Sequence, residues 1–347
     1  MAGDRSIKVG IVGLGFMAAT HIKAYRQIPE AHIHMICNAS GRCLDGDLTK
    51  VGGNINANDP VRLDMSAVKA TRDFNELLRD PAVQLVDICT PTLQHPEMLA
   101  AALRAGKHVL CEKPLARTSE LAKQMVDATR QAKTFAMPAM CLRFWPEWAW
   151  LKEAIQKNTY GKVLSARFRR VAEPPTWGQK HFAQGASSGG AILDLHIHDV
   201  DFIQFCFGKP RRVFATGYSK YTGAIDHVVA QYEVNSGAIV HAEGGWAMAP
   251  GFGFSMGYTV NFENATADYD LARTPDNLLR IFRPGNPAES VKCTGPDGYV
   301  GELRHLIDSI QGGKAPSVVT MEDGLNAIRI CEAEEKSIAS RAPVEVS

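Results

Sequence analysis

The apolar residues of this chain follow two successive patterns, which predict two domains. In residues 1–138, short apolar runs alternate with stretches of helical periodicity. Strands separated by helices indicate right-handed crossovers and a doubly wound parallel sheet, so we expect an α/β domain here. The expected strands are 7–12, 32–37, 85–90, 108–111 and 134–138, and the expected helices are 17–27, 75–80, 97–105 and 119–132.

The pattern changes after residue 138. Helices are expected over 147–156 and 189–206, and a strand over 162–171. Residues 212–282 contain only strand-like runs with turn signals between them, and two helices, 301–311 and 321–339, close the chain. We therefore predict that residues 139–347 form an α+β domain with a large, open, mostly antiparallel sheet.

Composition excludes several classes of protein. The 347 residues include 38 basic and 37 acidic side chains, for a net charge of +1, so no nucleic-acid partner is expected. No apolar run approaches the roughly 18 residues of a membrane span, and the N-terminus lacks the apolar core of a signal peptide. Eight cysteines are scattered singly, without a CxxC pair, which is typical of a reducing compartment. We expect a cytoplasmic protein.

A glycine-rich turn follows the first strand. Residues 13–18 read G-x-G-x-x-A, in which Gly13 and Gly15 permit a tight turn and a close backbone approach. Phe16 and Met17 then begin a helix whose N–H groups would point at a diphosphate. The alternative is a tight turn without a ligand. The place of the motif, at the first strand of a βαβ series, favours dinucleotide binding.

The residues after the second strand bear on the choice of cofactor. Enzymes that use NAD usually have an acidic residue there, which holds the ribose 2′-hydroxyl. This chain has Asn38, followed by Ser40 and Arg42, which could hold a 2′-phosphate. The loop therefore favours NADP(H) over NAD(H). The alternative is that Arg42 is a solvated loop residue.

Two further segments concentrate chemical groups. The strand at 108–111 ends in Glu112, Lys113 and Pro114, which indicates a positioned amine at a strand tip. On a continuous helix, Asp194, His198 and Asp201 would share one face, and a carboxylate one turn before an imidazole can orient it. We favour an acid/base pair. A metal site and a structural pair are the alternatives, and the absence of a known metal-binding motif leads us to predict no metal.

These segments resemble the signatures of the Gfo/Idh/MocA oxidoreductases, the glucose–fructose oxidoreductase and inositol dehydrogenase family. The similar segments are TPTLQHPEMLAAALRAGKHVLCEKPLA at 90–116, GGAILDLHIHDVDF at 189–202 and GELRHLIDSIQGGKAPSV at 301–318. The resemblance extends over essentially the whole chain. It implies an N-terminal Rossmann domain that binds NAD(P), and a C-terminal domain that contributes substrate contacts. It also implies a homodimer or homotetramer formed through the open sheet.

The resemblance assigns roles to individual residues. It places Lys113 beside the nicotinamide and the reacting hydroxyl, and it makes Asp194 and His198 the catalytic acid/base residues. Thr90, Pro91 and His95 would line the nicotinamide-ribose side. Glu112 would contact the cofactor ribose or hold Lys113. In this family the peptide bond before Pro114 is often cis.

The resemblance further implies hydride transfer to or from a secondary hydroxyl or ketone of a sugar, cyclitol or derivative. His198 would take the hydroxyl proton, Asp194 would orient it, and Lys113 would polarise the oxygen. His196 replaces a glycine that is frequent in the family, and it would either narrow the pocket or pack against the sheet. Candidate substrate contacts, each with ordinary packing as the alternative, are Arg143, Trp177, Lys180 and Tyr299.

Two other functions are compatible with the same fold. One is a glycoside-cleaving enzyme that uses bound NAD transiently to form a keto intermediate. The other is a regulator that binds a dinucleotide without catalysis. The intact Lys113, Asp194 and His198 argue against the regulator, because a binding protein does not need an acid/base pair.

Overall fold

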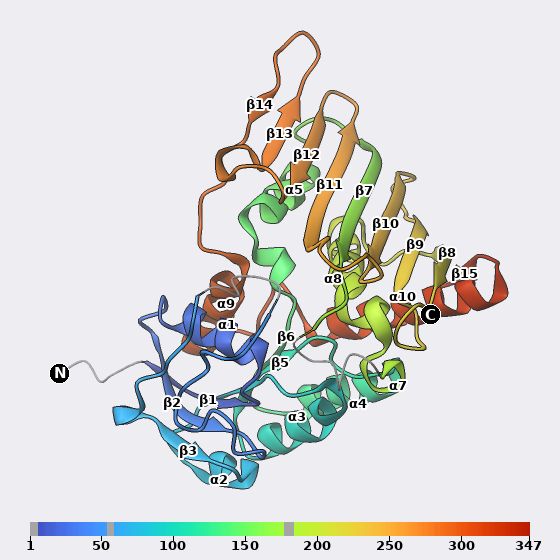
Figure 1. Ribbon diagram of the computed structural model, residues 1–347. Helices are drawn as coiled ribbons and strands as arrows, with labels where there is room; N and C mark the ends of the chain where they lie inside the picture. The colour runs from blue at the N-terminus through green and yellow to red at the C-terminus, as the bar shows by residue number, and fades with distance from the viewer. Residues whose placement is uncertain (1–5, 54–58, 177–183) are drawn as a thin grey trace. The chain divides into compact units, whose positions relative to one another are not determined.

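The computed structural model describes residues 6–53, 59–176 and 184–347 (Figure 1). The chain is divided into two compact units, and each of them is discontinuous in sequence. The first unit comprises residues 1–141 and 297–325, and the second comprises 142–296 and 326–347. The boundary expected after residue 138 lies close to the observed one. Segment 297–325, which we expected in the C-terminal domain, belongs instead to the first unit.

A six-stranded sheet forms the core of the first unit. All of its strand pairs are parallel, and their order is β3-β2-β1-β4-β5-β6. This is the order of the doubly wound dinucleotide-binding fold, and it confirms the predicted Rossmann sheet. The central strands are buried along nearly their whole length because parallel sheets are covered on both faces. The strand bounds are β1 Ile7–Val12, β2 Ala31–Cys37, β3 Lys69–Thr71, β4 Leu85–Ile88, β5 His108–Glu112 and β6 Ala136–Ala139.

Three helices of this unit begin at a side chain that caps free N–H groups. Asp73 caps α2, Thr118 caps α4, and Asp297 caps α9. The α-helix bounds are α1 Phe16–Tyr25, α2 Phe74–Arg79, α3 His95–Arg104, α4 Ser119–Gln131 and α9 Gly298–Gly312. Two short 3₁₀ turns, η1 Met65–Ala67 and η2 Thr92–Gln94, complete the unit.

Two elements of the first unit differ from the sequence-based expectation. Strand β3 was not predicted, because it has three residues, of which two are exposed. Helix α9 was expected in the C-terminal domain, but its side chains bind the first unit. Arg304 donates a 3.0 Å hydrogen bond to the carbonyl oxygen of Gln27 and lies 3.5 Å from the Glu30 carboxylate.

A nine-stranded sheet dominates the second unit. Its order is β14-β13-β12-β11-β7-β10-β9-β8-β15, and β7 and β10 form its one parallel pair. This confirms the predicted large and mostly antiparallel sheet. The strand bounds are β7 Val163–Ala172, β8 Arg212–Tyr218, β9 His227–Glu233, β10 Ile239–Gly245, β11 Phe254–Phe262, β12 Thr266–Asp270, β13 Leu279–Phe282, β14 Glu289–Ser290 and β15 Val344–Glu345.

One face of this sheet carries the core of the second unit. Trp148 is fully buried there, with its ring 6.0 Å from that of Phe168 and 4.8 Å from that of Phe202. The helices and turns of this unit are η3 Cys141–Phe144, α5 Pro146–Gln156, α7 Gly185–Ser188, η4 Ile192–His196, α8 Ile197–Phe207, η5 Pro275–Asn277 and α10 Met321–Ser340. Helix α10 begins in the first unit and continues into the second from Asn326.

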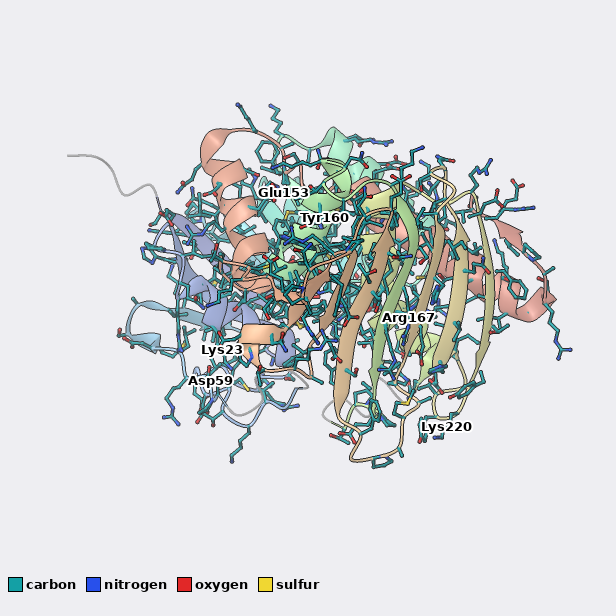
Figure 2. The ribbon with its side chains drawn as sticks, turned by 90° about the horizontal axis from the view of Figure 1, so that it is seen from above. Lys23, Asp59, Glu153, Tyr160, Arg167 and Lys220 are labelled. Atoms are coloured by element: carbon teal, nitrogen blue, oxygen red, sulfur yellow. The ribbon has the colours of Figure 1, made fainter. Side chains whose placement is uncertain are left out.

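The other face of the nine-stranded sheet is open. Figure 2 shows the strands side by side, with Arg167 of β7 among them. Along β8 and β9, exposed and buried residues alternate, as expected for a sheet with one solvent-facing side. Large apolar side chains nevertheless lie on the exposed side, including Phe214, Val229 and Ile239, which are between 40% and 59% exposed. Polar residues stand opposite each of them on the neighbouring strands, Gln231 opposite Phe214, Thr216 opposite Val229 and Glu233 opposite Ile239.

Candidate active site

The turn between β1 and α1 has the geometry of a diphosphate cradle. Gly13 has φ +86°, and a Cβ atom there would lie 2.7 Å from the carbonyl oxygen of Cys89. Gly15 precedes α1, and within the described chain no side chain caps the helix at this residue. A Cβ at Gly15 would meet no described atom within 4 Å. A helix that starts directly after such a glycine turn offers its N-terminus to an anion, and these residues fit a dinucleotide diphosphate.

The loop after β2 is held by its own side chains. Asn38 donates a 2.8 Å hydrogen bond to the carbonyl oxygen of Arg42 and accepts a 3.1 Å bond from the Ser40 hydroxyl. The side chains of Ser40 and Arg42 lie on its exposed surface. The neutral Asn38 stands at the strand end where a carboxylate would repel a 2′-phosphate. The loop thus presents a hydroxyl and a guanidinium on a fixed backbone.

Arg72, which follows β3, is a residue that the sequence analysis missed. Its guanidinium donates a 2.9 Å hydrogen bond to the carbonyl oxygen of Ser40. It also lies over Gly41, where a Cβ would be 2.6 Å from the Arg72 Nη2 atom. Arg42 and Arg72 therefore belong to one loop surface. The signal was missed because three-residue strand β3 was not predicted, and only the parallel pairing of β3 with β2 brings Arg72 to this loop.

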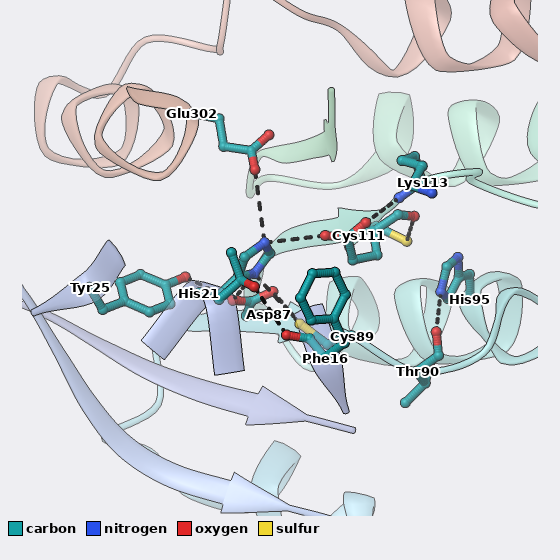
Figure 3. Close-up of polar contacts among 12 residues, drawn as sticks. Phe16, His21, Tyr25, Asp87, Cys89, Thr90, His95, Cys111, Lys113 and Glu302 are labelled. Carbon is teal, nitrogen blue, oxygen red and sulfur yellow. Dashed lines mark hydrogen bonds and ion pairs between the residues drawn. The ribbon is translucent and has the colours of Figure 1, made fainter. Parts of the chain in front are cut away.

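A buried polar cluster lies around His21 of α1 (Figure 3). Its Nδ1 atom is 2.9 Å from the Asp87 carboxylate, and its Nε2 atom is 3.2 Å from Glu112 and 3.8 Å from Glu302. Tyr25 donates a 3.1 Å hydrogen bond to Asp87. Burial lowers the pKa of His21, but Asp87 raises it and prevails, so the ring is cationic. Burial raises the pKa of Glu302, which favours its neutral form.

The possible ligand atoms of His21, Asp87 and Cys89 lie within 4.8 Å of one another. These atoms already contact each other, since the Cys89 thiol is 3.4 Å from Asp87 and 3.5 Å from His21. Burial raises the pKa of the Cys89 thiol well above its ordinary value, so it remains protonated. An internally paired imidazolium and carboxylate account for this group. The sequence analysis missed the cluster because its members are far apart in the chain.

Glu112 connects this cluster to Lys113. One of its carboxylate oxygens accepts a 3.0 Å hydrogen bond from the backbone N–H of Lys113, and the other faces His21. Of the two roles expected for Glu112, the structure thus shows the one that holds Lys113. The peptide bond between Lys113 and Pro114 is cis, as the resemblance implied. From Val109 to Ala116, Lys113 alone is partly exposed.

His95 does not have the role that we expected. It is 1% exposed, and its two ring nitrogens lie 2.9 Å and 2.8 Å from the carbonyl oxygens of Pro114 and Thr90. A neutral ring donates to only one of these two carbonyl oxygens, but the main chain faces both nitrogens and leaves almost no ring surface for a ribose. Burial lowers the pKa of His95. His95 therefore fastens the segment after β4 to the segment after β5. Thr90 is half-buried and Pro91 is exposed at the same strand ends.

The second signature does not form one continuous α-helix. Residues Ile192–His196 form the π-turn η4, and α8 starts at Ile197. A π-turn inserts an extra residue into a helix and frequently occurs at functional sites. From Ala191 to Val200, only Asp194 and His198 are partly exposed. The two residues expected to act as acid and base are therefore the two that this segment leaves accessible.

Asp201 departs from the expected shared face. It is fully buried, and it accepts hydrogen bonds of 2.8 Å and 2.6 Å from the Arg143 guanidinium. Arg143 itself is 4% exposed, so our interpretation of it as a substrate contact is wrong. Asp199 is likewise buried and pairs with Arg170 at 2.7 Å. Buried charges are tolerated only when they are paired, which explains why these residues anchor the helix.

The remaining substrate candidates have different outcomes. Trp177 and Lys180 lie outside the described residues. Tyr299 lies in the first turn of α9 and is 8% exposed. Burial raises the pKa of Tyr299, and the nearby carboxylates of Glu112 and Glu302 add to the shift. The Tyr299 hydroxyl therefore belongs to the surroundings of the His21 cluster.

Among the helices that the structure describes, none has both the length and the apolar character of a membrane span.

Comparisons with known proteins agree with this geometry. The pattern of the "Oxidoreductase family, NAD-binding Rossmann fold" matches residues 7–139, and that of the "GFO/IDH/MocA C-terminal domain" matches residues 148–268. The chain is 27% identical to myo-inositol 2-dehydrogenase of Thermotoga maritima over 98% of both proteins. It is 30% identical to 1,5-anhydro-D-fructose reductase of Ensifer adhaerens over 80% of this chain and 84% of that one.

Solved structures agree at the level of the fold. A levoglucosan dehydrogenase in complex with NADH and levoglucosan superposes with a TM-score of 0.84, with 99% of each chain covered and 23% sequence identity. Both family domains are thus present, in the order that the sequence predicted. The chain is an oxidoreductase that belongs to the Gfo/Idh/MocA family of NAD-binding enzymes.

Proposed function

We propose that the protein transfers hydride between a nicotinamide cofactor and a carbon that bears a secondary hydroxyl or ketone in a sugar, cyclitol or related polyol. The substrate class is supported by the relatives, whose names include a myo-inositol dehydrogenase and an anhydrofructose reductase. When bound, the nicotinamide ring donates or accepts the hydride. The residues of this chain then have to bind the cofactor, orient the substrate oxygen and move one proton.

The observation that carries the proposal is selective exposure within two buried segments. Lys113 is the partly exposed residue of 109–116, and Asp194 and His198 are those of 191–200. Charged side chains are seldom placed within such apolar runs without a role. The same three residues match the catalytic positions of the family signatures. Exposure and sequence match thus select the same lysine, aspartate and histidine.

Each of these three residues has a distinct chemical role. In the oxidation direction His198 accepts the hydroxyl proton as the hydride leaves, and Asp194 orients its imidazole. Lys113 donates a hydrogen bond to the reacting oxygen and stabilises the negative charge that develops there. In the reduction direction the same groups act in reverse. None of these three roles requires a metal ion.

We also propose that NADP(H) is preferred over NAD(H). Arg42 belongs to the loop after β2, where a 2′-phosphate would bind, and Arg72, which follows β3, is hydrogen-bonded to that loop at Ser40. Asn38 replaces the usual carboxylate. The Ser40 hydroxyl donates to Asn38 and accepts from the backbone N–H of Arg42, so it shapes this loop. The guanidinium groups of Arg42 and Arg72 give this region positive charge, which a phosphate would neutralise.

The first experiment compares cofactor affinities by tryptophan fluorescence, after bound cofactor has been removed. We expect at least tenfold tighter binding of NADPH than of NADH. Arg42→Ala and Arg72→Ala should each remove most of that difference and leave NADH affinity within twofold. Arg79→Ala, an exposed arginine of α2 paired with Asp73, is the matched control. Equal losses for both cofactors would contradict the 2′-phosphate assignment.

The second experiment tests the reaction itself. Purified protein is incubated with NADP⁺ or NAD⁺ and a panel of inositols, anhydrosugars and aldoses, and NAD(P)H absorbance is followed. We expect turnover with at least one member of the panel, and a loss of at least a hundredfold in kcat with His198→Ala. Unchanged turnover in that variant would exclude His198 as the base. Tightly copurified NAD with cleavage of glycosides and no net reduction would exclude a simple dehydrogenase.

The open face of the nine-stranded sheet supports a homo-oligomer. We propose that a second copy of the chain covers Phe214, Val229 and Ile239, because self-association buries apolar area that a monomer leaves in water. A dimer or tetramer is consistent with the open face of the nine-stranded sheet.

All eight cysteines are unpaired, which supports a reducing, cytoplasmic environment.

A further inference from the structure

A second buried group of polar side chains lies beneath the π-turn, and no part of the proposed chemistry uses it. It consists of His196 of η4, Tyr232 of β9 and Glu334 of α10, which we call the Glu334 network. The Tyr232 hydroxyl donates a 2.7 Å hydrogen bond to one Glu334 oxygen. The His196 Nε2 atom lies 3.1 Å from the Tyr232 oxygen and 3.4 Å from the other Glu334 oxygen. Tyr232 is 2% exposed and the other two are fully buried.

The hydrogen bonds of this network determine the protonation of one nitrogen atom. Because the Tyr232 proton is used on Glu334, the Tyr232 oxygen can only accept from His196. The Nε2 atom of His196 must therefore carry a proton in either charge state of the ring. Within the described chain, Nδ1 of His196 and the second oxygen of Glu334 have no hydrogen-bond partner. A buried polar atom without a partner costs free energy, so its presence in a folded protein needs an explanation.

Space for the imidazole is provided by a glycine. A Cβ atom at Gly244 of β10 would lie 2.3 Å from Nδ1 of His196 and 2.8 Å from its Cβ. The ring therefore packs directly on the backbone of β10. This settles the two alternatives for His196, since a side chain with no exposed surface packs against the sheet and does not narrow a pocket.

His196 is one of three buried anchors on the segment that carries Asp194 and His198. Asp199 is fixed by Arg170 of β7, and Asp201 is fixed by Arg143 of η3. Both of those anchors lie within α8, on the C-terminal side of His198. His196 is the anchor within the π-turn itself, two residues after Asp194 and two before His198. The other contacts of the turn include the apolar packing of its buried residues and a 3.7 Å contact from the Cys331 thiol to the Ile192 carbonyl oxygen.

We propose that the Glu334 network is a positioning device: it holds the π-turn in one orientation and thereby sets the directions in which Asp194 and His198 project. His196, Tyr232 and Glu334 contact neither substrate nor cofactor in this proposal, so they are positioning residues. The inference rests on the proposed roles of Asp194 and His198. Displacement of a catalytic group by about 1 Å can cost on the order of a hundredfold in rate.

Charges around the network favour a stable ion pair. Burial lowers the pKa of His196, but the Glu334 carboxylate raises it and prevails. The other groups that bear on the ring are Asp199 with its partner Arg170, and His227, which lies 3.6 Å from Glu243. The Cys331 thiol of α10 also lies near the network, and burial raises its pKa, so it is neutral. Glu334 is thus the main counter-charge of His196.

The test uses two nearly isosteric variants of the full chain, Tyr232→Phe and Glu334→Gln. We expect kcat to fall at least tenfold in each, while the substrate KM and the Kd for NADPH stay within about twofold. Because the three residues act as a unit, the double variant should be little worse than either single variant. Glu335→Gln, a half-buried neighbour on the same helix, is the control for the loss of one charge.

Circular dichroism and melting temperature verify that each variant is folded, and a general loss of structure would also raise the Kd for NADPH. Unchanged kcat in folded Tyr232→Phe and Glu334→Gln would overturn the inference. So would equal loss of kcat in Glu335→Gln. His198→Ala is measured in parallel, because unchanged turnover in that variant would mean that the proposed function has failed, and not the positioning by the network.

Discussion

At the scale of single residues, accessibility distinguishes the chemical groups from the structural ones. Lys113, Asp194 and His198 could be predicted from the sequence because each stands in a short signature. His21, Glu302 and Arg72 could not, because their partners lie far away in the chain. Arg143 and His95 were misjudged for a related reason. A sequence does not show whether a polar side chain will meet solvent or a buried partner.

Lys113 can be tested by removing its charge. We expect Lys113→Met to lower kcat/KM by about 10² to 10³, the range found when one donor to a developing oxyanion is lost. NADPH affinity should change by less than threefold. Steady-state kinetics with the best substrate of the panel measure both. Lys123→Met, on the exposed surface of α4, is the control and should be silent. A smaller loss than tenfold would exclude charge stabilisation by Lys113.

Glu302 predicts a pH dependence of stability. Its pKa is raised by burial, so the stability that its proton provides is present below the unfolded pKa of about 4.3 and is lost as pH rises through the folded pKa. Glu302→Gln mimics the neutral acid. The free energy of unfolding of Glu302→Gln, measured relative to that of the parent protein, should therefore increase from pH 5 to pH 8. The increase is at most about 1.4 kcal/mol per pH unit.

Urea denaturation at several pH values measures this difference. Glu120→Gln, an exposed acidic residue in the first turn of α4, provides the control and should show no such trend. A constant difference between Glu302→Gln and the parent over the whole range would mean that Glu302 is ionised in the folded protein.

At the scale of elements, periodicity predicted most helices and strands, and the exceptions have physical causes. The run 189–206 reads as one helix because its apolar residues are dense. The π-turn within it depends on contacts with β9, β10 and α10, which a local pattern cannot contain. Strand β3 is too short for a periodic signal, and β2 alone specifies it through pairing. The glycine-rich turn, in contrast, was fully predictable, because its chemistry is local.

Substitutions at two glycines of that turn distinguish an effect on stability from an effect on cofactor binding. Gly13→Ala places a Cβ against the Cys89 carbonyl at a positive φ, so we expect a loss of about 1–3 kcal/mol in stability together with weak cofactor binding. Gly15→Ala meets no described atom, so stability should fall by less than about 1 kcal/mol. Its methyl group would nevertheless obstruct the diphosphate, and NADPH affinity should fall at least tenfold. Denaturation measures the stability of each variant, and fluorescence titration measures its NADPH affinity. A strongly destabilised Gly15→Ala would contradict the assignment of Gly15 to diphosphate binding.

At the scale of the whole molecule, the two units have different architectures. The first is a parallel sheet buried on both faces, and the second is an antiparallel sheet with one open face. The change in the pattern of apolar residues along the chain made both predictable. The return of the chain to the first unit at 297–325 was not, because α9 has an ordinary amphipathic pattern. Glu302 and Arg304 of α9 contact α1 and the loop after it, and these contacts join α9 to the first unit.

The open face yields a prediction about assembly. Phe214→Glu combined with Ile239→Lys places charges on its apolar side chains, so we expect the oligomer to dissociate to monomers. Light scattering coupled to size-exclusion chromatography measures the mass. Phe252→Glu, an equally exposed aromatic residue in the loop before β11, is the matched control. An unchanged mass in the double variant would show that the copies associate through another surface.

The discontinuous first unit has a consequence for biosynthesis. Ribosomes release a chain from its N-terminus, so β1 to β6 emerge long before α9 has been translated. During that interval the imidazole of His21 and the carboxylates beside it remain open to water on the side that Glu302 later covers. A translation stop anywhere within residues 142–296 leaves both units unfinished. The cell's quality control then meets one incomplete protein, and not a finished nucleotide-binding domain released on its own.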